Sequence, residues 1–314
     1  MPHASPNLKP TFLRWRIVAM LSGIVFLAHF NRVSISVAAN AHFIGPEYPV
    51  FGTLMDAVGW QSAFAICGIV LMLFTLAWHR LSTDRPAQQL PGSEAPRSEM
   101  SLREVLGLLR NRSLLLLALS YGAIGYVQYL FFYWIEYYFK NVLKVSTSES
   151  RTSAFLITTG MAVGMIGGGW IADGLCRTFG RRWGCRAMAF LGMGLGSAFS
   201  LLGIATADAN YVTLWFALAL GSLGLCEGVF WTMAPILEPR RGGLACALVN
   251  TGGNGIGMLA PIITPILGLH FGWNSAIFVA CLISAIGGIL WLGIDETPRS
   301  RPEPRTASDH PIVE

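Results

Sequence analysis

The sequence predicts an all-α membrane protein, and three properties of the chain support this prediction. Hydrophobic residues make up 53% of the 314 residues and charged residues only 12%, whereas about 25% of the residues in a soluble protein are charged. The mean hydropathy is +0.53. The apolar residues are also collected in long runs with short polar segments between them, as in a bundle of membrane-spanning helices.

Eight of these runs are long enough to cross a membrane, which takes about 20 apolar residues. They lie near residues 17–40, 60–79, 113–138, 153–174, 186–206, 211–236, 243–269 and 273–294. Residues 41–59 are interrupted by Pro46, Pro49 and Gly52, and we expect this segment to be too short and broken to form a further span.

The basic residues predict the orientation of the spans. Of the 22 lysines and arginines, 18 fall in five segments on one side of the membrane: the N-terminus, 80–112, 177–186, 240–241 and the C-terminal tail. Lys140, Lys144 and Arg151 fall on the other side, and Arg32 lies inside a span. The positive-inside rule then places both termini in the cytoplasm, at the inner membrane if the chain is bacterial. This pattern accounts for the net charge of +5 and excludes nucleic acid as a partner.

The polar segments divide the chain into four parts. Residues 82–100 are rich in Pro, Ser, Gln and Glu and are typical of a linker. Residues 101–112 have the apolar spacing of an amphipathic helix that leads into the next span. The predicted parts are a two-span half (1–79), a cytoplasmic linker with an amphipathic helix (80–112), a six-span half (113–296) and a disordered cytoplasmic tail (297–314).

A short internal repeat relates the two halves. Gly59–Phe64 reappears with conservative changes as Gly272–Ile277, and each copy opens an apolar span that runs in the same direction. About 159 residues separate position 113 from Gly272, but only about 45 separate the first span from Gly59. The first half is therefore shorter by roughly 114 residues, which corresponds to about four spans.

Residues 169–182 carry a specific motif at the end of a glycine-rich apolar helix. Helical spacing puts Gly169 and Asp173 on one face. Three arginines follow in a tight turn before the next apolar run: Arg177, Arg181 and Arg182. The carboxylate can cap the next helix or pair with a guanidinium and so latch two helices together. The alternative is that the arginines are only cytoplasmic anchors. The combination resembles the loop signature of the major facilitator superfamily.

Further motifs resemble the anion:cation symporter family within that superfamily. They are Asn31–Ala38, Tyr133–Tyr138, Gly228–Trp231 with Glu238-Pro239, and the pattern Asn250, Gly253, Asn254, Gly257 and Pro261. The resemblance implies a major-facilitator-type helix bundle, and the count of apolar runs and the repeat spacing predict that it is truncated to about eight transmembrane helices. It also implies a secondary transporter of an organic anion (a sugar acid, an aromatic acid or a dicarboxylate) that symports a proton or sodium by alternating access.

Two departures from the family pattern favour an alternative to a working transporter. The family's first-span aspartate, a candidate for proton coupling, is Asn31 here, and an amide cannot titrate. The missing spans include the fourth, where the resemblance implies further charged substrate and coupling residues. A chain without these spans would also leave polar faces open to lipid, which is costly. The chain could therefore be a non-transporting remnant or a membrane interaction protein that self-associates.

Two charged residues inside spans are candidates for function. Arg32 suits a carboxylate substrate because its planar fork offers paired donors, although it could also reach the outer interface or pair structurally. Glu227 lies near the middle of 211–236, where an ionised carboxylate would be expensive. We regard it as a candidate to carry the coupling proton that Asn31 cannot.

Uncharged polar and aromatic residues complete the candidate substrate site. Asn250 and Asn254 share a helix face and could bind substrate hydroxyls or join helices. Tyr121 and Gln128 form a second stripe, although Tyr121 could simply pack against neighbouring helices. Trp231 could stack on a substrate or belong to the core.

No motif for an enzyme, a cofactor or a metal site is recognised in the sequence. The six cysteines are scattered without a CxxC pair and are interpreted as small hydrophobic residues. Gly252–Gly257 looks like a dinucleotide-binding loop but lies inside an apolar span with no preceding strand. Three pairs of glycines four residues apart predict close helix packing: Gly164/Gly168, Gly192/Gly196 and Gly253/Gly257.

Overall fold

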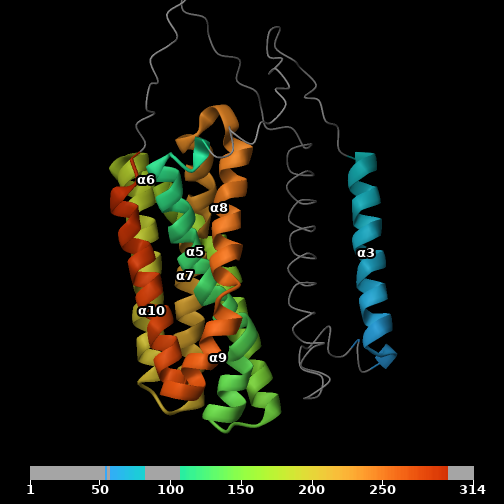
Figure 1. Cartoon of the computed structure of the whole chain (residues 1–314). Coiled ribbons are helices and arrows are strands. Elements are labelled where there is room, and N and C mark those ends of the chain that lie inside the picture. Colours follow the sequence, from blue (N-terminus) through green and yellow to red (C-terminus); the bar gives the residue numbers. More distant parts are fainter. Residues whose placement is uncertain (1–53, 55–56, 82–106, 296–314) are drawn as a thin grey trace, which may run out of the picture. The chain divides into compact units, whose positions relative to one another are not determined.

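The structure is a computed structural model that describes residues 54, 57–81 and 107–295 (Figure 1). All regular secondary structure in these ranges is helical. The chain divides into two compact units, residues 1–98 and 99–314. The first unit contributes α3 (Trp60–Leu81), an apolar helix whose side chains are mostly exposed in this unit.

The second unit is a bundle of long helices that lie side by side (Figure 1). Its helices are α5 (Arg112–Tyr137), α6 (Thr147–Ile204), α7 (Ala209–Leu237), α8 (Gly242–Gly257), α9 (Ala260–Phe271) and α10 (Trp273–Leu290). Short helical turns follow three of them: the π-helix η1 (Tyr138–Val142) and the 3-10 helices η2 (Pro239–Arg241) and η3 (Trp291–Gly293).

α6 is a pair of antiparallel helices joined at Gly180. This glycine has φ 76° and ψ 156°, outside the helical region and at a φ that favours glycine. A Cβ on Gly184 would lie only 2.6 Å from Cα of Cys176, although residues eight apart in a straight helix are separated by about 12 Å. The chain therefore reverses direction here, and the arginine-rich turn predicted from sequence is reduced to a single non-helical residue.

The helices agree closely with the predicted spans. Six helical stretches of the described residues are long and apolar enough to cross a membrane, and the reversal in α6 makes seven crossings. Each corresponds to one predicted run, while the run at 17–40 lies outside the described residues. The predicted span 243–269 differs in detail, because Met258 and Leu259 interrupt it ahead of Pro261, so that it forms α8 and then α9.

The internal repeat is confirmed in the backbone. Gly59 and Gly272 both have positive φ, 79° and 87°, and each directly precedes a helix that begins at tryptophan. The carbonyl of each glycine accepts the first helical hydrogen bond four residues on, from the N–H of Ala63 (3.0 Å) and of Ala276 (3.4 Å). The repeated sequence thus encodes the same helix start twice.

The helices of the second unit alternate in direction. At one end, the Asn111 amide donates to the carbonyl of Leu237 (3.3 Å), which joins the start of α5 to the end of α7. At the other end, the Tyr138 hydroxyl donates to Oδ1 of Asn274 (2.9 Å), and Nδ2 of Asn274 donates to the carbonyl of Ile204 (3.3 Å). The arginines at 110–112, 177–186 and 240–241 belong to the first end. Lys140, Lys144 and Arg151 belong to the second.

Glycines allow the helices to approach until their backbones touch. A Cβ on Gly164 would lie 2.0 Å from the carbonyl oxygen of Gly221, and one on Gly168 would lie 2.2 Å from that of Leu225. The other two predicted glycine pairs also face atoms of neighbouring helices within 3.0 Å of the added Cβ. The prediction of close packing at all three pairs is therefore confirmed. The contacts of α6 with α7 and of α5 with α8 are the most extensive.

Candidate functional site

Three of the predicted site residues lie together between α5 and α7. Glu227 of α7 is only 8% exposed. The Tyr121 hydroxyl donates to its Oε1 (2.7 Å), and Nε2 of Gln128 donates to its Oε2 (2.9 Å). Each carboxylate oxygen thus has a hydrogen bond, which offsets the cost of holding this polar group in an apolar interior.

Helical spacing explains why α5 supplies both donors. Tyr121 and Gln128 are seven residues apart, which is close to two turns, so their side chains project from one face toward α7. Both donors are uncharged, and both side chains also contain an acceptor. The same two residues can therefore bond to Glu227 as a carboxylate or, after rotation of the hydroxyl and the amide, as a carboxylic acid.

Aromatic rings border the carboxylate cluster. The ring of Tyr121 lies 5.2 Å from that of Phe230 and 5.3 Å from that of Trp231, the latter edge-on. Trp231 remains 37% exposed, so part of its indole is open to a ligand or to lipid. Gly253 of α8 makes room for Tyr121, because a Cβ there would lie 2.5 Å from a ring carbon.

Asn250 and Asn254 form a second polar cluster with Tyr129, on the face where α8 meets α5. The Tyr129 hydroxyl donates to Oδ1 of Asn254 (2.9 Å), and Nδ2 of Asn254 donates to Oδ1 of Asn250 (3.0 Å). Asn254 is thus occupied in joining the two helices, whereas Asn250 is exposed. Of the two amides, Asn250 is the more exposed.

The two polar clusters flank one backbone contact between α5 and α8. A Cβ on Gly125 would lie 2.2 Å from the carbonyl oxygen of Gly253. A Cβ on Gly257 would lie 2.5 Å from the ring of Tyr129. Since the glycines hold α5 against α8, they fix the rings of Tyr121 and Tyr129 and, through them, the two sets of hydrogen bonds.

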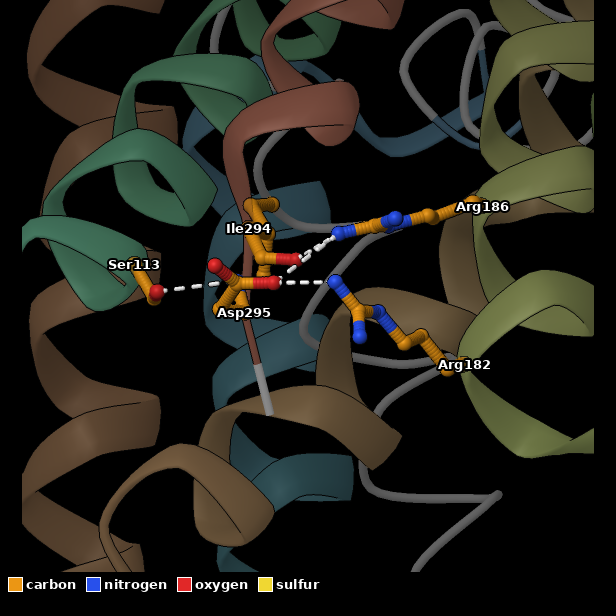
Figure 2. Close-up of polar contacts among 5 residues, drawn as sticks. All are labelled: Ser113, Arg182, Arg186, Ile294 and Asp295. Atoms are coloured by element: carbon orange, nitrogen blue, oxygen red, sulfur yellow. Dashed lines mark hydrogen bonds and ion pairs between the residues drawn. The ribbon is translucent and has the colours of Figure 1, made fainter. Parts of the chain in front are cut away.

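A charged cluster joins α6 to Ile294 and Asp295, which follow α10 and η3 (Figure 2). The Arg182 guanidinium pairs with the carboxylate of Asp295, and that of Arg186 donates to the carbonyl of Ile294. Arg186 also lies 3.4 Å from the Asp295 carboxylate, whose backbone N–H donates to the Ser113 hydroxyl (3.0 Å). The cluster thus ties α5, α6 and the end of α10 together at the arginine-rich end.

The structure differs here from the predicted latch. Asp173 is exposed, and the described part of the chain gives it no ion pair. A Cβ on Gly169 would meet nothing within 4 Å. Helical spacing correctly puts Gly169 and Asp173 on one face, but that face is turned away from neighbouring helices of the described residues. Asp295 is the carboxylate that meets Arg182 and Arg186.

Arg177 and Arg181 are exposed beside the turn at Gly180. Arg32 lies outside the described residues, so its predicted substrate contact stays a prediction. Sequence reasoning did not identify Tyr129 or Asp295 as members of these clusters. The available signal for Asp295 was an acidic residue that follows the last span on the side where the arginines gather.

Comparison with known proteins identifies the class. A model of the Major Facilitator Superfamily matches residues 43–232 and 175–314. Together these matches cover most of the chain, which therefore belongs to this superfamily. A bacterial homolog of the human lysosomal transporter Spinster has a similar fold, with a TM-score of 0.53 and 14% identity over 75% of this chain and 59% of that one. The predicted fold class is confirmed.

Relatives within the superfamily are named as transporters of acids. The probable L-galactonate transporter of Escherichia coli (strain K12) is 20% identical over 84% of this chain and 61% of its own length. The hexuronate transporter of Bacillus subtilis (strain 168) is 20% identical over 69% of this chain and 53% of its own length. The chloroplastic ascorbate transporter of Arabidopsis thaliana is 24% identical over 76% of this chain and 46% of its own length. The chain thus spans about half to three-fifths of the length of these relatives. Their names are those of transporters rather than enzymes.

Proposed function

We propose that this chain is a membrane transporter of an organic anion, with a sugar acid as the first candidate substrate, and that it couples transport to a proton by alternating access. The superfamily match and the names of the relatives support the class. The proton is assigned to Glu227.

The hydrogen bonding of Glu227 is the observation that carries the proposal. Within residues 107–295, the buried carboxyl of Glu227 has two uncharged hydrogen-bond partners and no ion pair to hold it in the charged form. Tyr121 and Gln128 can each act as donor or acceptor and therefore suit both protonation states. Tyr121 contacts both Trp231 and the carboxyl of Glu227. A ligand at the exposed indole could therefore change the hydrogen bonding of the carboxyl through this one side chain.

Two residues, each considered within its own unit, favour a hydroxylated carboxylic acid as the substrate. In the first unit, Arg32 offers paired donors to a carboxylate. In the second unit, the exposed amide of Asn250 offers a donor and an acceptor to substrate hydroxyls. An aromatic acid or a simple dicarboxylate lacks these hydroxyls.

A second function class is favoured by the unequal spacing of the internal repeat. The first half is shorter than the second by roughly 114 residues, which is the basis for the alternative of a non-transporting membrane interaction protein that self-associates. Alternating access needs two opposed helix bundles. The two classes differ in whether the chain binds an anion at all.

The test is a calorimetric titration of the purified chain with L-galactonate, D-glucuronate and ascorbate, with galactose as the neutral control. We expect binding of an acid and none of galactose. Charge-assisted hydrogen bonds are worth about 1.5–3 kcal/mol, so Arg32→Lys should weaken binding roughly tenfold to hundredfold, and Arg32→Gln should weaken it further. Binding indifferent to both substitutions would remove Arg32 from the site, and the absence of binding by the unmodified chain would favour the second class.

We also infer that both termini are cytoplasmic, in the inner membrane if the chain is bacterial. The clustering of arginines at one end of the second unit supports this orientation under the positive-inside rule.

A further inference from the structure

Two cysteines that are nine residues apart meet across the turn in α6. Sγ of Cys176 lies 3.7 Å from Sγ of Cys185, although both were interpreted from sequence as isolated hydrophobic residues. The turn at Gly180 places the two helices of α6 side by side, with Cys176 on one helix and Cys185 on the other. The absence of a side chain on Gly184 lets the backbones touch, since a Cβ there would lie 2.6 Å from both N and Cα of Cys176.

This geometry is close to that of a disulfide. An S–S bond is about 2.05 Å long, so the sulfurs must approach by about 1.7 Å, which rotation of two side chains supplies when the backbones are already in contact. Neither sulfur is part of a disulfide in this structure.

The two thiols differ in their access to solvent. Cys176 is half-buried, and its Sγ lies 3.9 Å from the carbonyl oxygen of Arg181 in a segment that contains three arginines. Cys185 is only 1% exposed. An oxidant can reach a partly exposed thiol from solvent, whereas a buried thiol reacts only with groups that lie next to it inside the protein.

We propose that Cys176 and Cys185 form a reversible dithiol–disulfide site that is oxidised by hydroperoxides. The Cys176 thiolate attacks a peroxide oxygen and breaks the O–O bond, which gives a sulfenic acid and releases hydroxide. The Cys185 thiolate then attacks the Cys176 sulfur and expels a second hydroxide. The S–S bond forms, two electrons pass from the sulfurs to the peroxide, and hydrogen peroxide is converted into two molecules of water by the two thiol protons.

The disulfide would constrain the backbone of the turn at Gly180. It closes a ring from residue 176 to residue 185, which includes Arg181 and Arg182, next to the contact of Arg182 with Asp295. On the predicted cytoplasmic side the surroundings are reducing, so a disulfide there forms transiently. The inference does not depend on the proposed function, because the site exists whether or not the chain transports an anion.

The experiment uses the full chain, purified in detergent with its cysteines reduced. The protein is treated with hydrogen peroxide, the remaining thiols are blocked with N-ethylmaleimide, and the product is digested with trypsin. Trypsin cleaves after Arg177, Arg181 and Arg182, so the reduced chain releases the two cysteines on separate peptides. We expect a cross-linked pair of peptides that loses two hydrogens, loss of the maleimide adduct at both cysteines, and reversal by dithiothreitol. The protein should stay monomeric on a non-reducing gel.

Two variants control the result. In Cys185→Ser the sulfenic acid at Cys176 has no resolving thiol and should accumulate as a dimedone adduct. Cys246→Ser removes another half-buried cysteine and should leave the cross-link unchanged. Maleimide adducts at both cysteines after peroxide treatment, a cross-link found only in a covalent dimer, or equal dimedone labelling of the unmodified chain and Cys185→Ser would each overturn the proposal.

Discussion

At the residue scale, the hydrogen-bonded cluster around Glu227 could be predicted only in part from the sequence. A carboxylate in an apolar span is unusual and identifies Glu227 as a candidate. The spacing on α5 puts Tyr121 and Gln128 on one face. Neither observation says that α5 faces α7, so the hydrogen bonds could not be predicted. Tyr129 was missed for the same reason, because its partner Asn254 is 125 residues away in the chain.

The Tyr121 hydroxyl gives a test of this cluster. Tyr121→Phe leaves one oxygen of a buried carboxylate without its donor, which costs about 1–3 kcal/mol in the free energy of unfolding. We expect a lowered thermal unfolding temperature in detergent. Tyr211→Phe is the matched control on α7, because Tyr211 is largely exposed, and its effect should stay within about 0.5 kcal/mol. Equal effects of the two substitutions would contradict the assigned hydrogen bond.

At the element scale, apolar run lengths predicted the helices well because a span needs a set number of apolar residues. Details that depend on single residues could not be predicted. The run at 243–269 is long enough for one helix, and only the structure shows that it breaks before Pro261. Likewise, the motif at 169–182 identified a turn with arginines, while Asp295, the partner of Arg182, follows the last helical turn (η3) 113 residues further along the chain.

Glycine contacts between α6 and α7 give a prediction at this scale. Gly164→Ala would drive a methyl group into the backbone of Gly221 and should destabilise the protein by about 1–3 kcal/mol through overpacking. Gly169→Ala, on the same helix, meets open space and should instead gain about 0.5–1 kcal/mol from helix propensity. Thermal unfolding of the two variants measures the difference. A Gly164→Ala protein as stable as Gly169→Ala would show that the helices do not pack at this glycine.

The contact of Asp295 with Arg182 and Arg186 gives a second prediction at the element scale. Asp295→Asn removes the carboxylate from Arg182, which is half exposed, and from Arg186, whose side chain is only 9% exposed. Surface pairs contribute little, so most of the effect should come from Arg186, with a total near 1–2 kcal/mol. Asp173→Asn is the control and should have no measurable effect. If Asp173→Asn is the more destabilising of the two in thermal unfolding, Asp173 is the latch residue after all.

At the scale of the whole molecule, the alternation of charge between the two ends predicts topology. Cysteines introduced at Ser148 and Ala207 should react with an impermeant maleimide added outside intact cells, and one at Thr178 should not, in a background without the native cysteines. The chosen residues are exposed and cap no helix through their side chains, unlike Ser146 and Asp208. Labelling of Thr178→Cys from outside would invert the proposed orientation.

The sequence predicted the class of the molecule because superfamily motifs and apolar runs are local signals. The packing of α5 between α7 and α8, which assembles both polar clusters, depends on contacts between residues about 100 or more positions apart. Such contacts are set by the complementary shapes of helix faces, which helical spacing within one span does not contain.

The measurement that tests the central claim most directly is uptake of labelled L-galactonate into proteoliposomes under an imposed pH gradient, acidic outside. We predict faster uptake with the gradient by the unmodified chain and by Glu136→Gln, which converts a carboxylate outside the buried cluster. We predict that Glu227→Gln abolishes the response to the gradient, because an amide cannot exchange the proton. An undiminished response in Glu227→Gln, uptake driven by sodium alone, or no uptake by the unmodified chain would contradict a proton-coupled anion transporter centred on Glu227.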